Sequence, residues 1–121
     1  MNYTQPEGTA IVAESRLVFI AKAAGTLVAV KAAVFLGATG ADRTVDVDVQ
    51  KSTGGGATAT VLSANIQFVD ATTDLTVSSG TISASTYAAS DIFEVVITVA
   101  GAAGNQAQGL IVSLYFEEPT S

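Results

Sequence analysis

The segment from Arg43 to Lys51 alternates between valine and polar residues, and this pattern constrains the fold more than any other feature of the chain. On an extended chain the valines lie on one face and the polar side chains on the other, which sets Val45, Val47 and Val49 against Thr44, Asp46, Asp48 and Gln50. A period of two with β-branched residues on the apolar side is typical of a β-strand with one buried face. The segment therefore predicts a strand that covers a core and turns a polar face to water.

The preceding segment, from Thr26 to Leu36, is apolar on both faces of the predicted strand. One face carries Val28, Val30, Ala32, Val34 and Leu36, and the other carries Leu27, Ala29, Ala33 and Phe35. Because neither face offers a polar stripe to water, we expect this strand to be covered on both sides. One face would pack on the core, and the other would be covered either by another subunit or by the chain's own loops.

Similar patterns predict further strands over residues 11–23, 58–63, 76–84, 91–100 and 110–116. In the first of them the inward side chains are expected to be Ile11, Ala13, Leu17, Phe19 and Ala21, and the strand over 76–84 is expected to be anchored by Val77 and Ile82. The glycines within 52–56 indicate a flexible loop, and 66–74 fits either an irregular loop or a helical turn. Six to eight strands without a convincing helix predict an all-β fold, an antiparallel β-sandwich.

The two ends of the chain are predicted to lie outside that sandwich. Residues 1–8 are polar and include Pro6, so they are expected to form an extended N-terminal arm and not a core strand. Residues 9–118 are expected to form a single sandwich domain and 119–121 a short tail, because the sequence Glu117-Glu118-Pro119 should stop the last strand.

Composition excludes several classes of function. The net charge is −6 with only five basic residues, which argues against nucleic acid and against an anionic membrane surface as partners. The chain has no Cys and no His, so serine and cysteine catalytic triads, common zinc sites and disulfides are not possible. We expect neither a signal peptide nor a membrane-spanning segment, and we expect assembly in a cytoplasm. The chain is not expected to be an enzyme or to need a cofactor or metal.

Asp46 and Asp48 are the residues that could carry chemistry. They lie on the same strand face about 7 Å apart, and a carboxylate pair could hydrolyse a glycoside. The pair could also contribute to a Ca²⁺ site, although one strand supplies too few of the oxygen ligands required. Acidic residues that alternate with valine are far more often the solvated side of a strand, which is the interpretation we favour.

Two stretches of the sequence resemble a recurrent structural module of tailed bacteriophages. They are AGTLVAVKAAVFLGATGADRTVDVDVQK, which ends in a "VDVxK" strand, and SASTYAASDIFEVVITV, in which Asp91 precedes a long apolar strand. The resemblance covers about residues 24–117. It implies a small jelly-roll virion protein, a capsid decoration (cement) protein that binds the outside of the shell and clamps neighbouring capsomeres. The same module also resembles parts of phage tail fibres and whiskers.

The resemblance makes the major capsid protein and further copies of the chain the expected partners, with a homotrimer favoured over a homodimer, on the exterior of the virion capsid. Apolar side chains predicted to face away from the core are the expected oligomer interface: Val18, Ile20, Val96, Ile111 and Tyr115. Scattered apolar residues are ordinary on a surface, but a cluster would mark a subunit contact.

The N-terminal arm is the expected capsid contact, through Asn2, Tyr3, Thr4, Gln5, Pro6 and Glu7, with 117–121 as a second segment; both could instead be frayed ends. Deletion of residues 2–8 is expected to abolish capsid binding and leave the fold intact. The alternative function is a tail-fibre or whisker module that binds a host-surface glycan or receptor. It would use the loop aromatics, for which Tyr3 and Tyr87 are the candidates.

Overall fold

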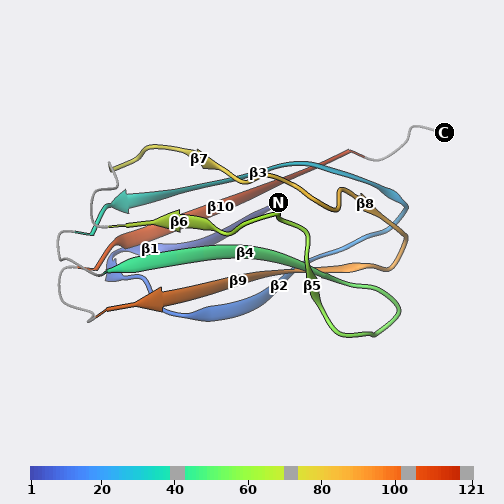
Figure 1. The fold of residues 1–121 in the computed structure, drawn as a ribbon, viewed down its shortest axis with the longest axis horizontal. Helices are drawn as coiled ribbons and strands as arrows, with labels where there is room; N and C mark the ends of the chain where they lie inside the picture. Colours follow the sequence, from blue (N-terminus) through green and yellow to red (C-terminus); the bar gives the residue numbers. More distant parts are fainter. Residues whose placement is uncertain (39–42, 70–73, 102–105, 118–121) are drawn as a thin grey trace.

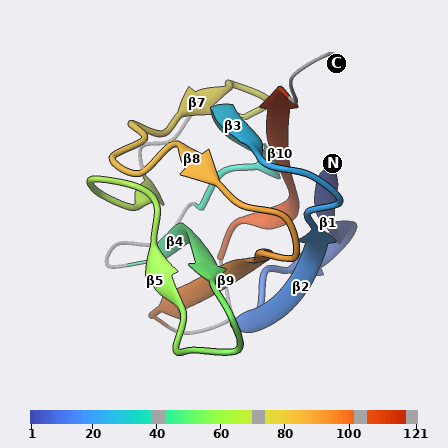
Figure 2. The same cartoon turned by 90° about the vertical axis from the view of Figure 1, so that its right-hand side faces the viewer.

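The computed structural model describes residues 1–38, 43–69, 74–101 and 106–117, and within these ranges it is an all-β sandwich with ten strands and no helix. Two antiparallel sheets pack against each other, and Figure 2 shows them as separate layers. Sheet A contains β1 (Asn2–Ala10), β10 (Gln108–Glu117), β3 (Gly25–Leu36), β7 (Ser78–Ser79) and β8 (Thr86–Tyr87). Sheet B contains β2 (Glu14–Ile20), β9 (Ile92–Ala100), β4 (Thr44–Ser52), β5 (Ala59–Thr60) and β6 (Ile66–Phe68).

The strands pair in a nested order (Figure 1). The first strand pairs with the last, β2 pairs with β9, and β3 and β4 then take the other sides of β10 and β9. This connectivity is jelly-roll-like. The strand number exceeds the predicted six to eight because two edge positions are each occupied by two short pieces, β5 with β6 and β7 with β8.

The breaks in those edge strands join the two sheets on one side of the sandwich. Leu62 of the break between β5 and β6 forms an isolated bridge with Ile82 of the break between β7 and β8. Around it, Ser63 N–H donates to Thr81 O and Ser83 N–H donates to Val61 O, each at 2.8 Å. Pairing across the sheets therefore satisfies backbone groups that a straight edge strand would leave open.

The core matches the predicted alternation in the long central strands. The valines of β4 are fully buried. The inward residues of β9 in the same sheet and of β3 and β10 in the opposite sheet are buried as well: Val30, Ala32, Val34, Phe93, Val95, Ile97, Leu110, Val112 and Leu114. Phe19, Tyr87, Phe93 and Phe116 fill one end, with ring centroids 4.2 to 6.3 Å apart. Burial of each large apolar side chain contributes about 1.5–3 kcal/mol.

Two irregularities in strand pairing reverse the predicted sides of some residues. The register of β2 on β9 shifts between Leu17 and Phe19, so Leu17 is 62% exposed while Val18 packs against the core. The register of β10 on β3 shifts between Tyr115 and Phe116, so Leu27 is buried and Val28 is exposed. Each shift inserts a residue into one strand, and a single inserted residue exchanges the two faces.

Several predicted strand bounds also differ from the structure. Residues 66–68 form strand β6, and of 58–63 and 76–84 only the short pieces β5 and β7 are strand. Val77, predicted as an anchor, is 60% exposed, whereas Ile82 packs against the core.

The prediction of an N-terminal arm outside the sheets is wrong. Asn2–Ala10 is strand β1 of sheet A, and Tyr3 and Gln5 are buried inside the sandwich. The Met1 ammonium donates to Leu114 O at 3.1 Å, so the pairing begins at the first residue. A proline was expected to exclude this segment from a sheet, because it has no N–H to donate. Pro6 is tolerated here because it lies in the register break after Gln5, where no hydrogen bond between the strands is lost. The predicted tail, 119–121, lies outside the described residues.

Candidate interaction surfaces

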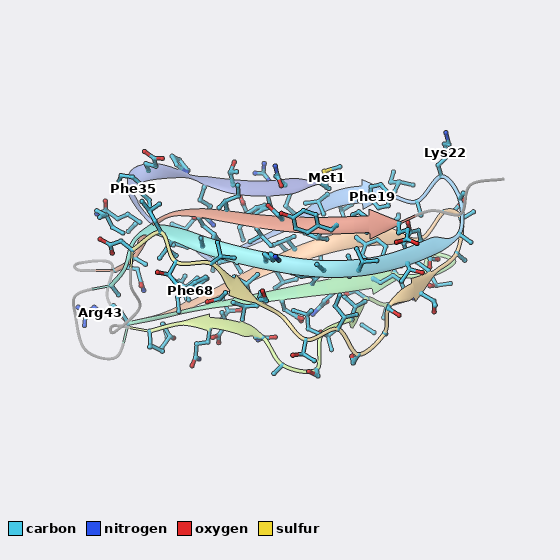
Figure 3. All side chains as sticks on the ribbon, turned by 90° about the horizontal axis from the view of Figure 1, so that it is seen from above. Met1, Phe19, Lys22, Phe35, Arg43 and Phe68 are labelled. Atoms are coloured by element: carbon cyan, nitrogen blue, oxygen red, sulfur yellow. The ribbon has the colours of Figure 1, made fainter. Side chains whose placement is uncertain are left out.

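The outer side of sheet A, termed here the A face, is predominantly apolar. Cross-strand register sets Ile111 of β10 between Thr4 and Ala33, and sets Tyr115 opposite Ala29. Exposed apolar side chains on or beside this face are Phe35, Leu75, Val77, Ile111 and Tyr115, with exposed fractions of 38 to 67%. Figure 3 looks onto this sheet, with β1, β10 and β3 side by side and Phe35 near one end. The A face therefore leaves large apolar side chains open to solvent, and the polar row Asn2, Ser113 and Lys31 crosses it between Ile111 and Tyr115.

The A face is hollowed into a shallow groove. One hollow, of about 390 Å³, lies between β1 and the side chains of Phe35 and Leu75. A second hollow, of about 410 Å³, is lined by Lys31, Val77 and Tyr115. Both hollows are lined by Ala33 and Ile111, so they form one continuous depression, termed here the A-face groove.

Gly109 keeps the first hollow open. Its φ is +66°, and a Cβ atom there would lie 2.9 Å from Phe35 Cβ and 3.2 Å from Glu7 Cα. A glycine is required both by the positive φ and by the close approach of β1 to β3 across β10.

The charged side chains among the described residues that line the groove are one of each sign. Glu7 lines the first hollow and Lys31 lines the second. Both are exposed, and neither takes part in an ion pair with another described residue. The groove therefore has an acidic end and a basic end, with the apolar pair Ala33 and Ile111 between them.

The outer side of sheet B is polar over β4. Gln67 Nε2 donates to Asp46 Oδ1 at 2.8 Å, Thr60 Oγ1 donates to Asp48 Oδ1 at 2.5 Å, and Gln50 Nε2 donates to Asp48 Oδ2 at 2.9 Å. Both carboxylates thus accept hydrogen bonds from neighbours on the same face. In the described part of the chain, no three His, Cys, Asp or Glu side chains are grouped so as to hold a metal ion.

The other half of that outer side carries apolar side chains of β2 and β9 around Glu94, which pairs with Leu17 across the strands. Cross-strand pairing brings Ile20 opposite Ile92, and Ser15 opposite Val96, with Leu17 between these two positions on β2. Leu17 and Ile20 are 62% and 68% exposed, and Ile92 and Val96 are half-buried. We term this group, Leu17, Ile20, Ile92 and Val96, the β2–β9 patch.

The five predicted interface residues do not form one cluster. Ile111 and Tyr115 lie on the A face, Ile20 and Val96 lie in the β2–β9 patch on the opposite side of the sandwich, and Val18 packs against the core. Val18 is therefore excluded from the predicted interface. Leu17 and Lys31 were missed, the first because of the bulge and the second because a lysine on an outward face is ordinarily solvated.

The six predicted capsid-contact residues also fall into two groups, one buried and one exposed. Tyr3 and Gln5 are buried and are not surface contacts, while Asn2, Thr4, Pro6 and Glu7 are exposed. Thr4, Pro6 and Glu7 line the A-face groove, so β1 contributes one rim of the same surface that carries Ile111. The tyrosines considered for glycan binding, Tyr3 and Tyr87, are both buried.

A hydrogen-bond network around Tyr3 joins the edges of the two sheets. Tyr3 Oη donates to Glu14 Oε1 at 2.5 Å and accepts from Gln5 Nε2 at 2.7 Å. Gln5 also bonds the backbone N–H and C=O of Val12, and Arg16 pairs with Glu14 at 3.1 Å. Burial, and then the bond to Glu14, raise the pKa of Tyr3 to about 12, while the same bond lowers the pKa of Glu14. The network fixes β1 against β2.

Comparison with models of known protein families, with curated proteins and with solved structures gave no match to this chain. Among the described residues there is no helix with the length and apolar character that a membrane crossing requires.

Proposed function

We propose that this chain is a non-enzymatic structural protein of a phage virion, which binds the outside of the capsid as a homo-oligomer and stabilises the shell by clamping neighbouring capsomeres. The observation that carries the proposal is the presence of two exposed apolar surfaces, the A face and the β2–β9 patch, on opposite sides of one sandwich. The assignment to a phage comes from the resemblance of residues 24–117.

A shell-binding oligomer needs one surface for its own copies and another for the shell. We assign the A face to contact between copies, because it carries more exposed large apolar side chains than the β2–β9 patch and is hollowed. We assign the β2–β9 patch to the capsid, because Leu17 and Ile20 project from an edge strand on the side away from the A face. Exposed side chains of this size commonly mark protein contacts when they cluster.

Shell stabilisation follows from mass action. A protein that binds the assembled shell and not the dissociated subunits shifts the equilibrium towards assembly. An oligomer presents the patch several times, so weak individual contacts combine into avidity. The net charge of −6 suits a shell exterior better than an interior lined with nucleic acid.

The test is co-sedimentation with capsids that lack this protein. The wild-type chain should co-sediment and raise the temperature at which the shells dissociate. The variant Leu17→Glu/Ile20→Glu should lose both effects, because it places charges in the proposed contact. Thr53→Glu, which adds a charge in an exposed loop, is the control and should bind normally. Wild-type protein that stays in the supernatant would contradict the proposal.

A tail-fibre or whisker module that binds a host-surface glycan or receptor is the second candidate. It is favoured by Tyr115, which is 48% exposed and lines the second hollow beside Lys31 and Ser113. An exposed aromatic ring next to polar groups suits a sugar ring. Glycan-array binding that is lost in Tyr115→Ala would support this candidate, whereas no binding to any glycan would support the capsid role.

A further inference from the structure

We propose that the A-face groove binds a second copy of this chain across a two-fold axis, with Lys31 of each copy opposite Glu7 of the other. The inference deepens the proposed function, because it names the surface and the symmetry of the contact between copies. It differs from the homotrimer that the sequence favours.

The two charged ends of the A-face groove, Glu7 and Lys31, are close enough for one partner to cover both. Lys31 and Phe35 are four residues apart on β3, which corresponds to about 13 Å. Glu7 lies beside Phe35, across Gly109. An interface of ordinary size covers about 800 Å² on each partner, which extends well beyond this span. Lys31 and Glu7 therefore face the same partner, and do not face different neighbours in a ring.

A second copy of this chain supplies the charges that complement Lys31 and Glu7. A partner on this face must place an anion against Lys31 and a cation against Glu7, or bury each charge unpaired at a considerable cost. A second A face carries both groups at the matching separation. A two-fold axis that lies in the interface and passes between Lys31 and Glu7 forms both pairs at once, which is the self-complementary contact of a symmetric dimer.

The surface between Lys31 and Glu7 is suited to burial in an interface. The two hollows meet at Ala33 and Ile111, with Phe35 at the Glu7 end and Tyr115 beyond Lys31 at the other end. A small residue beside a large exposed one gives a surface with both a recess and a projection. An apolar centre with charged groups at its ends is the usual composition of a protein interface.

The experiment is a charge exchange, measured as the mass of the protein in solution in the absence of capsids. Wild-type protein should have twice the chain mass of 12.2 kDa. Lys31→Glu places two anions against each other and Glu7→Lys places two cations, so each variant alone should dimerise at least about tenfold more weakly. An equimolar mixture of the two variants should restore dimers, and so should the double variant Lys31→Glu/Glu7→Lys.

Lys22→Glu is the matched control, because Lys22 is exposed and lies at the opposite end of the sandwich from Phe35 (Figure 3). It should remain dimeric, and every variant should keep the wild-type circular dichroism spectrum, which shows that each chain still folds. A monomeric or trimeric wild-type protein, unchanged dimers in the single variants, or a mixture that stays monomeric would each overturn the inference. Since no capsid is present, these outcomes leave the capsid-binding test independent.

Discussion

Lys51 and Asp91 form an ion pair, with Lys51 Nζ 3.8 Å from Asp91 Oδ2. Lys51 ends the "VDVxK" strand, and Asp91 precedes the apolar strand β9, so the pair joins the two stretches on which the phage resemblance rests. Asp91 is buried, and its Oδ2 also accepts the N–H of Ala88 at 2.9 Å. Lys51 donates to Thr86 O at 2.9 Å. These two residues therefore hold the turn before β9 against the end of β4, which is a structural role.

Removal of Asp91 should destabilise the fold. Asp91→Ala deletes a buried acceptor and leaves Lys51 without its carboxylate, which should lower the free energy of unfolding by about 2–4 kcal/mol. Asp91→Asn keeps an acceptor for the Ala88 N–H and should cost less. Urea denaturation measures both, with Asp46→Asn on the polar face of β4 as the control, for which a change within about 0.5 kcal/mol is expected. Equal losses at Asp46 and Asp91 would contradict this role.

Deletion of residues 2–8 should unfold the domain or strongly destabilise it, contrary to the expectation from sequence. The deletion removes most of β1 and exposes the β10 edge. Tyr3→Ala alone should cost about 3–5 kcal/mol, because it leaves a large cavity between the sheets. Thr4→Ala, on the exposed side of the same strand, is the control. Circular dichroism during heating measures both, and a deletion variant with a wild-type melting temperature would contradict the assignment of β1.

The bond between Tyr3 and Glu14 should make stability depend on pH at both extremes. The folded-state pKa of Glu14 is lowered, so its contribution is complete above its unfolded pKa and is lost as pH falls through the lowered value. The folded-state pKa of Tyr3 is raised from 10.0 to about 12, so its contribution is complete below pH 10 and is lost as pH rises towards 12. Tyr3→Phe should reduce both dependences. Unfolding midpoints measured across pH test this, and unchanged slopes in the variant would count against the bond.

Gly25→Ala should also destabilise the fold. A Cβ atom at Gly25 would lie 2.5 Å from Tyr87 Oη and 2.6 Å from Glu117 O, and the latter is backbone that cannot rotate away. Overpacking of this kind costs about 1–3 kcal/mol. Gly56→Ala, in an exposed loop, is the control and should have a smaller effect. Equal denaturation midpoints for the two variants would show that the close approach of Tyr87 is not a constraint.

The core and fold class could be predicted from sequence, because alternation depends on local residue order. Val45, Val47 and Val49 are buried as predicted, and the sandwich is confirmed. The bulges at Val18 and Val28 were not predictable, because an inserted residue depends on the partner strand and does not change the local residue pattern. The pairing of β1 with β10 was not predicted for a similar reason, since it joins the two ends of the chain. In addition, Pro6 is a residue that local patterns assign to a segment outside a sheet.

The surfaces were predicted only in part. Ile20, Val96, Ile111 and Tyr115 are on outer faces or partly exposed as expected, but alternation says which face of its own strand a residue occupies and not which sheet that strand joins. The division into an A face and a β2–β9 patch therefore needed the topology.

Copy number and position in purified virions decide whether this chain decorates the outside of a phage shell. We expect a fixed ratio of this chain to the major capsid protein, and density for the sandwich on the outer surface of the shell in a reconstruction. A few copies confined to the tail, or absence from the virion, would contradict it.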